Sequence, residues 1–167
     1  DYEAAVLAEK NAAIPAPPPK VPVLSRPLPR QCKSGIVSDD WKFSEIDRKS
    51  GAVSVMSSRQ CGNVSKRGII THPPFKNGVT GSVYSRFRIS LAPDECRFTA
   101  SVGKGDASTP GDGIFYKVAV KAAKDALPKV VSELNVTKHG WCTIEADLSP
   151  WAGRAIELYL IAAPGAN

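Results

Sequence analysis

Most of the chain alternates apolar and polar positions with a period of two, in short segments bounded by Gly, Pro, Asn and Asp. In the segment 82–91, for example, Phe87 and Ile89 fall on one face, while Arg86 and Arg88 fall on the other. This pattern predicts nine strands, at residues 41–47, 52–57, 68–71, 82–91, 96–103, 113–121, 129–136, 142–147 and 155–162. Many short strands separated by turn residues are typical of an all-β fold, and we expect an antiparallel β-sandwich.

The first 39 residues lack this alternation. Residues 1–13 are rich in helix formers and are expected to form a short helix or to be disordered. Residues 14–30 hold seven of the 14 prolines, which fix φ and remove backbone donors, so we expect an extended proline-rich arm over 14–39 and no regular sheet pairing within residues 1–30. The arm is either a stiff linker or a strap that docks on a protein partner. Docking would use its apolar side chains, which are Ile14, Val21, Val23 and Leu24.

Composition and charge exclude several classes of protein. With 167 residues, of which 43% are hydrophobic, the chain can bury one core of ordinary size, and we expect a single sandwich domain over 40–167. The net charge is +6, but no basic run exceeds two residues, so we expect a solvated surface and no nucleic-acid interface. No apolar stretch is long enough to predict a membrane span. Because the chain begins with Asp1, we expect a mature or excised fragment.

The four cysteines are scattered along the chain and only two histidines accompany them, which argues against a zinc site. An even number of scattered cysteines fits two disulfides in an oxidising compartment, so we expect an extracytoplasmic location: secreted, periplasmic or on the cell surface. Reduced, buried cysteines are the alternative. Of the three pairings that four cysteines allow, we predict Cys32–Cys61 and Cys96–Cys142.

Motifs for catalysis are missing from the sequence. It contains no GxSxG elbow, no HExxH pair, no P-loop and no GxGxxG after a strand. His72 precedes two prolines and His139 lies in a KHGW turn, and both are interpreted as satisfied or exposed residues. We therefore do not expect an enzyme.

A glycine-rich loop at 103–113 is the one candidate metal site. Its carboxylates, Asp106 and Asp112, could bind Ca²⁺ together with loop hydroxyls and carbonyls. The spacing does not match an EF-hand, and a polar hairpin loop without metal is the alternative. Calcium is therefore a candidate structural cofactor.

Three pieces of the sequence, in order, resemble a known family. The first is Gly-Ile-Ile-Thr-His-Pro-Pro at 68–74 with the strand after it; the second is 98–103, then a polar loop, then 113–118. The third runs from Trp141 through Asp-Leu-Ser at 147–149, with Ala-Gly and a leucine-rich strand following. This order resembles the NPCBM-like family of jelly-roll carbohydrate-binding modules over about residues 68–167. The cysteines, the proline-rich arm and the missing final acidic strand depart from the family pattern.

The resemblance implies a jelly-roll-like sandwich that binds galactose-type sugars, carries a structural calcium and has no catalytic activity. Sugar binding needs an aromatic face and planar polar groups. Candidate faces are Trp41, Trp141, Trp151 and Tyr84, with Trp151 expected to be the most exposed of the tryptophans. Candidate polar groups are His72, Arg86, Asn77 and Asn167. The alternative function is a β-sandwich that assembles with another protein and has no affinity for sugar.

Overall fold

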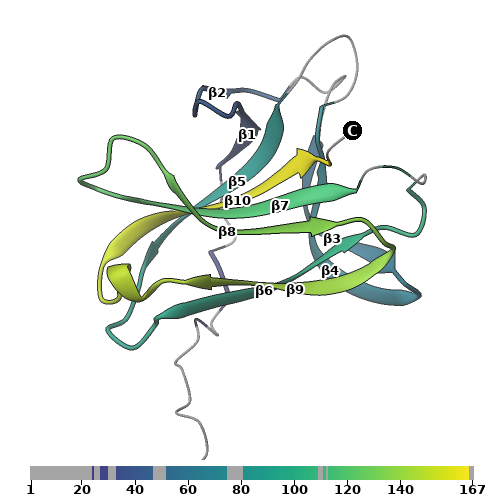
Figure 1. Ribbon diagram of the computed structural model, residues 1–167. Coiled ribbons are helices and arrows are strands. Elements are labelled where there is room, and N and C mark those ends of the chain that lie inside the picture. Colours follow the sequence, from purple (N-terminus) through teal and green to yellow (C-terminus); the bar gives the residue numbers. More distant parts are fainter. Residues whose placement is uncertain are drawn as a thin grey trace, which may run out of the picture.

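The protein is an antiparallel all-β sandwich in the computed structural model, which describes residues 24, 27–29, 33–46, 52–74, 81–108, 111 and 113–165 (Figure 1). Within these described residues, ten strands and one turn of 3₁₀ helix follow one another. They are β1 (Lys33–Val37), β2 (Phe43–Ser44), β3 (Ala52–Cys61), β4 (Val64–His72), β5 (Ser82–Ser90), β6 (Arg97–Lys104), β7 (Ile114–Ala122), β8 (Lys129–Val136), β9 (Gly140–Asp147), η1 (Ser149–Trp151) and β10 (Ala155–Pro164).

The two layers of the sandwich are built differently. One layer is a continuous six-stranded sheet in the order β2-β1-β5-β10-β7-β8. The second layer consists of two separate two-stranded units, the β3–β4 hairpin and the β6–β9 pair, which lie side by side beneath the first layer (Figure 1). β10 is the centre of the continuous sheet, since it pairs with β5 along one edge and with β7 along the other.

The main core lies between the two layers, and the period of two decides which residues enter it. On β5, Phe87 and Ile89 face the second layer and are almost fully buried, as the alternation predicts. Leu158 of β10 is the centre of the core, with no exposed surface. The second layer contributes from its own inward positions, which include Phe98 of β6 and Ile144 of β9.

The start of the domain differs from the sequence prediction. β1 lies within the predicted arm, yet it pairs with β5 over its whole length, so a boundary at Asp40 is too late. Leu24 is only 6% exposed and belongs to the main core, where Leu28 packs beside it. β1 was missed because Lys33 and Ser34 are exposed and only its second half is buried, which leaves too short an apolar pattern to register.

Strand lengths also differ at two places. The predicted strand 41–47 contains only the two-residue β2, because Trp41 has a φ of +62° that no extended strand can hold. The hairpin of β3 and β4 is longer than predicted and turns at Gly62-Asn63, where both residues have positive φ, as a two-residue hairpin turn requires. Apart from the buried Cys61, residues 58–67 of its outer half are exposed, so its sequence shows no alternation.

Candidate functional site

A cluster of four aromatic side chains covers part of the outer face of the six-stranded sheet, the face turned away from the second layer. The cluster, called the aromatic face below, consists of Trp41, Phe43, Tyr84 and Tyr159. Phe43 lies 5.1 Å from Tyr84 and 5.8 Å from Tyr159 between ring centroids. Trp41 meets Tyr159 edge-on at 6.3 Å. These distances lie in the range of attractive aromatic pairs, so the four rings form one connected surface.

The aromatic face has a buried base and an exposed top. Tyr84 of β5 and Tyr159 of β10 are each 2% exposed, whereas Phe43 is 43% exposed. Trp41 is half-buried and packs against the base together with Val37. Two rings are thus held rigidly by the sheet, and two present apolar surface to solvent.

The loop between β1 and β2 positions the two upper rings. Ser38 closes this loop: its backbone N–H donates to the carbonyl of Lys42, and its carbonyl accepts from the N–H of Trp41, both at 3.0 Å. The positive φ of Trp41 is uncommon for a large side chain and marks a position that the surrounding structure holds in place. Gly35 of β1 allows β2 and the Tyr84 ring to lie close to the β1 backbone, since a Cβ at this position would lie 2.5 Å from the carbonyl oxygen of Ser44 and 2.9 Å from the Tyr84 ring.

Charged groups border the aromatic face. Glu157 lies next to Tyr159 on the outer side of β10, and the Tyr159 hydroxyl donates a hydrogen bond of 2.8 Å to its carboxylate. Burial opposes ionisation of Glu157, but this hydrogen bond and three positive charges outweigh it and lower the pKa of Glu157. The charges belong to Arg86, Lys121 and Arg88. A carboxylate that stays ionised and two guanidinium groups therefore lie beside exposed rings.

The same contacts act on the tyrosines. Burial, together with the negative charge of Glu157, raises the pKa of Tyr159 to about 12. Burial also raises the pKa of Tyr84. Both rings thus stay neutral near pH 7, which suits a rigid apolar base and not an acid or base catalyst.

Of the six residues predicted to bind sugar, only Tyr84 and Arg86 come together, on the outer side of β5. Asn167 lies outside the described residues, and so does Asn77. His72 is exposed at the end of β4, where its Nδ1 lies 3.0 Å from the carbonyl oxygen of Pro73. Those predicted residues that the structure describes therefore do not all lie at one place, and sugar binding by them stays a prediction.

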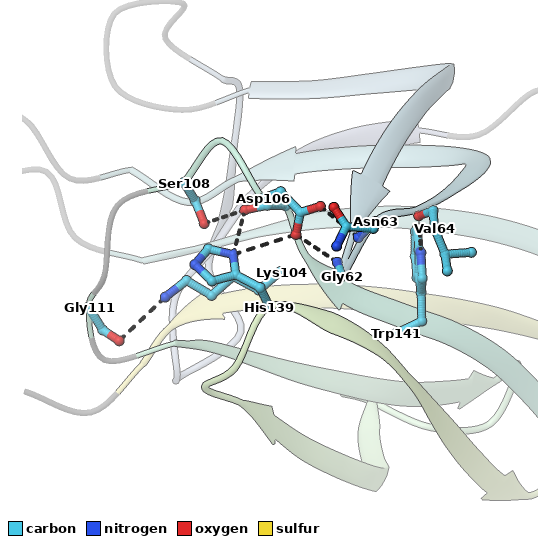
Figure 2. A network of polar contacts seen from close by, with 10 residues as sticks. Gly62, Asn63, Val64, Lys104, Asp106, Ser108, Gly111, His139 and Trp141 are labelled. Carbon is cyan, nitrogen blue, oxygen red and sulfur yellow. Dashed lines mark hydrogen bonds and ion pairs between the residues drawn. The ribbon is translucent and has the colours of Figure 1, made fainter.

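The tryptophans separate in the same way. Trp151, which was expected to be the most exposed tryptophan, is half-buried in η1 and packs against the main core; Trp41 and Trp141 are half-buried as well, so the expected order of exposure stays a prediction. Trp141 of β9 is half-buried in the second layer, where its indole N–H donates to the carbonyl of Val64 at 2.7 Å (Figure 2). The ammonium group of Lys66 lies over the Trp141 ring. Only Trp41, which the sequence offers as one of several faces, belongs to the aromatic cluster.

The sequence prediction missed two members of the aromatic face, Tyr159 and Phe43. Phe43 is the one of the two that presents apolar surface to solvent. It was treated as one position of an ordinary strand, and nothing in the local pattern shows that its ring is exposed. The ring partners that define its role lie about 40 and 115 residues away in the sequence, on β5 and β10. Only the order of the strands in the sheet brings them together.

The predicted calcium loop has a structural role on the side of Asp106. Its carboxylate accepts hydrogen bonds from the backbone N–H groups of Gly62 at 2.6 Å and Asn63 at 2.9 Å, which ties the turn of the β3–β4 hairpin to the loop after β6 (Figure 2). These two bonds and the nearby His139 lower the pKa of Asp106. His139 lies 3.0 Å from the carbonyl oxygen of Gly105 through its Nδ1.

No group of three or more His, Cys, Asp or Glu side chains that could hold a metal occurs in the part of the chain that the structure describes. Asp112, the second predicted calcium ligand, lies outside that part. Both oxygens of Asp106 already accept backbone amides. Calcium binding at this loop therefore stays a prediction, and Asp106 has a sufficient reason to be present without it.

The cysteines do not pair as predicted. Cys61, Cys96 and Cys142 are all free, and Cys32 lies outside the described residues. The register of β6 and β9 explains why Cys96–Cys142 is wrong: Cys142 lies opposite Val102, six residues from Cys96. Six residues of strand span about 20 Å, whereas a disulfide needs Cα atoms within about 7 Å. Burial raises the pKa of the Cys61 thiol, which makes it an unreactive core residue.

Comparison of the chain with family models, with curated proteins and with solved structures gives no match. The resemblance to the NPCBM-like family therefore stays a prediction from the sequence. In the described residues, no helix has the length and apolar character needed to cross a membrane. What the structure itself establishes is an all-β antiparallel sandwich with an aromatic surface on one outer face.

Proposed function

We propose that this domain is a non-catalytic carbohydrate-binding module and that the aromatic face is its ligand site. The observation that carries the proposal is the exposed ring of Phe43, held on a buried tyrosine base beside Arg86 and Glu157. Sugar rings stack their apolar C–H surfaces on aromatic rings. Guanidinium and carboxylate groups are planar and hydrogen-bond pairs of hydroxyls at the edge of a stacked ring.

Each part of this site has a defined role in the proposal. Phe43 supplies the stacking surface and Trp41 extends it, while the tyrosines fix the height and tilt of the rings. Arg86 and Glu157 supply a donor and an acceptor. A rigid base favours binding because little conformational entropy is lost when the ligand arrives.

The sugar class follows from the sequence resemblance alone, and a galactose-type glycan is the first ligand to test. An extracytoplasmic location also remains part of the proposal, although the free cysteines of the described residues remove the disulfide argument for it. The alternative, an assembly domain without sugar affinity, would use the same exposed ring as a protein contact.

A fluorescence titration against a panel of sugars, followed by calorimetry, tests the proposal. We expect a saturable change in tryptophan emission that Trp41→Phe abolishes and that Trp141→Phe and Trp151→Phe preserve. Phe43→Ala is expected to weaken binding about tenfold, the effect of losing roughly 1.4 kcal/mol of stacking. Val64→Ala is the matched control, because Val64 is 52% exposed but lies on the tip of the β3–β4 hairpin.

Binding of no sugar in the panel would contradict the proposal and favour the assembly domain. Binding that survives both Phe43→Ala and Arg86→Ala would show that sugar is held elsewhere on the domain. Folding of each variant is checked by its thermal midpoint, since Phe43 and Arg86 are not core residues and their substitution leaves the main core intact.

A further inference from the structure

The second layer is open between its two units. A groove of about 1880 Å³ lies between β4 and β6 and reaches the inner side of the six-stranded sheet. Its floor is apolar, with Phe98, Val118 and Leu160 among the lining residues. Pockets for small ligands usually measure about 300–1,000 Å³. The groove therefore has the size and character of a seat for an extended peptide segment and not for one sugar ring.

One wall of the groove is the free edge of β6. The backbone N–H of Leu148 donates to the carbonyl of Cys96, so Cys96 and every second residue after it direct their backbone polar groups towards β9. The residues between them direct theirs to the opposite edge, away from β9. They are Arg97, Thr99, Ser101 and Gly103. Within the described part of the chain, no strand pairs with this edge.

The backbone carbonyls at the two ends of the free edge have hydrogen-bond partners. In the middle, the hydroxyl of Ser101 accepts a hydrogen bond from Lys66 of β4 at 3.0 Å, but no other described strand forms a backbone hydrogen bond there. At one end the carbonyl of Arg97 accepts the backbone N–H of Leu24 at 2.6 Å. At the other end the carbonyl of Gly103 accepts the hydroxyl of Tyr116 at 2.7 Å. The N–H and C=O groups of Thr99 and Ser101 lie between these points. An open edge of this kind is a template for one more extended segment.

The position of Leu24 indicates which segment of the chain lies next to the free edge of β6. Its side chain is 6% exposed inside the main core, and its N–H lies at the beginning of the free edge. The chain immediately before Leu24 is the apolar, proline-rich stretch 14–23. We propose that residues 14–23 lie in this groove along the free edge of β6 and complete the second layer of the sandwich.

The length and chemistry of the segment fit the seat. Ten residues of polyproline II reach about 30 Å, and the edge from Arg97 to Gly103 spans about 20 Å. Proline lacks an N–H but keeps its carbonyl, so the segment can accept hydrogen bonds from Thr99 and Ser101, and edge positions tolerate proline. Polyproline II repeats every three residues, so in this arrangement Val21 and Pro18 lie on the same side as the buried Leu24 and supply apolar contacts for the floor. In this arrangement the proline-rich arm is an element of its own domain and not a linker to a partner.

Amide hydrogen exchange of the full chain tests this inference. We expect slow exchange at Thr99 and Ser101 in the wild type, and exchange at least about tenfold faster in Val21→Asp/Val23→Asp. The matched control is Val6→Asp/Leu7→Asp, which changes the same number of apolar residues outside the segment and is expected to leave both rates unchanged. Phe98 and Ala100 serve as internal controls, because their amides face β9 and should stay protected in every variant.

Three outcomes would overturn the inference. The first is rapid exchange at Thr99 and Ser101 in the wild type, which would show an uncovered edge. The second is slow exchange that persists when residues 1–23 are deleted, which would assign the cover to another part of the domain. The third is protection that falls on dilution, which would mean that a second copy donates the segment. Loss of sugar binding in these variants is not expected, because the aromatic face lies on the other layer.

Discussion

The two layers of this sandwich differ in how completely the edges of their strands are hydrogen-bonded to neighbouring strands. In the six-stranded sheet every inner strand has a partner on both edges, and β10 pairs with β5 and β7 over nearly its whole length. The second layer consists of two units that meet through a few contacts, chiefly the turn of the β3–β4 hairpin against Asp106 and the indole of Trp141 against Val64. The two layers therefore have different roles. The continuous layer supports a fixed aromatic surface, whereas the interrupted layer leaves a groove and a free strand edge.

The largest expected effect is the difference in stability loss between an alanine substitution in the core of the continuous layer and one in the second layer. Leu158→Ala should lower the free energy of unfolding by about 3 to 4 kcal/mol, because Leu158 has no exposed surface and paired strands on both sides prevent collapse of the cavity. Ile69→Ala, at a half-buried position on β4 beside the groove, should cost only about 1 kcal/mol. Urea denaturation measures both. Equal losses would mean that the second layer is as tightly packed as the first.

The next effect concerns the anchor of the arm. Leu24→Ala should lower the free energy of unfolding by about 2 to 3 kcal/mol, because the side chain is a member of the main core. Leu7→Ala, the same substitution within residues 1–13, should be silent. The urea midpoints of the two variants decide the matter. If Leu24→Ala left the urea midpoint unchanged, Leu24 would not contribute to the core and would be part of a linker. This result would also weaken the proposal that the arm lies in the groove.

A smaller effect tests the polar side of the continuous layer. Tyr159→Phe removes the hydroxyl that donates to Glu157 and should cost about 1 to 2 kcal/mol, as for a hydrogen bond to a charged group. The pKa of Glu157 should rise at the same time, because one interaction that favours the charged form is lost. Thermal unfolding gives the first quantity, and NMR titration of the carboxyl gives the second. An unchanged pKa would show that the three basic side chains alone keep Glu157 ionised.

The smallest effect concerns the contact between the units of the second layer. Asp106→Asn should speed amide exchange about tenfold at one of the two residues Gly62 and Asn63, because the amide side chain keeps only one of the two oxygens that accept their N–H groups. The pKa of Asp106 is lowered below 3.8, so the contact is fully formed above that value and is lost as the pH falls through the lowered pKa. The exchange difference between wild type and variant should therefore disappear in that acid range. A difference that persists there would assign the contact to something other than the carboxylate charge.

The regular strands of this fold could be predicted from the sequence with good accuracy, because burial on one face of a strand leaves an alternation that can be read directly. β5, β8 and β10 are the best examples, and their bounds lie within two residues of the prediction. The exceptions have local causes. β1 is short with an exposed first half, and the outer half of the β3–β4 hairpin is exposed except for Cys61, so neither carries the pattern.

The candidate site could be predicted only in fragments. Tyr84 and Arg86 were named as an aromatic ring and a planar polar group, and they do lie together on the outer side of β5. Trp151 packs against the main core, and the indole of Trp141 is hydrogen-bonded to the carbonyl of Val64, so these two rings lie elsewhere. The exposure of an aromatic residue is a property of what covers it, and the covering residues are distant in sequence. The disulfide prediction failed for the same reason, because the register of β6 against β9 decides the distance between Cys96 and Cys142.

By itself, the sequence determined the all-β class, the positions of most strands and the face of each strand that enters the core, because these depend on neighbours one and two residues apart. Only the tertiary structure decided the order of the strands. That order in turn decided which side chains form the aromatic face, which turn Asp106 contacts and which strand edge stays open. It placed Phe43 over Tyr84 and Tyr159, used Asp106 to hold a distant turn, and left the edge of β6 open beside Leu24. These contacts join residues far apart in the chain, and no local pattern encodes which strands become neighbours.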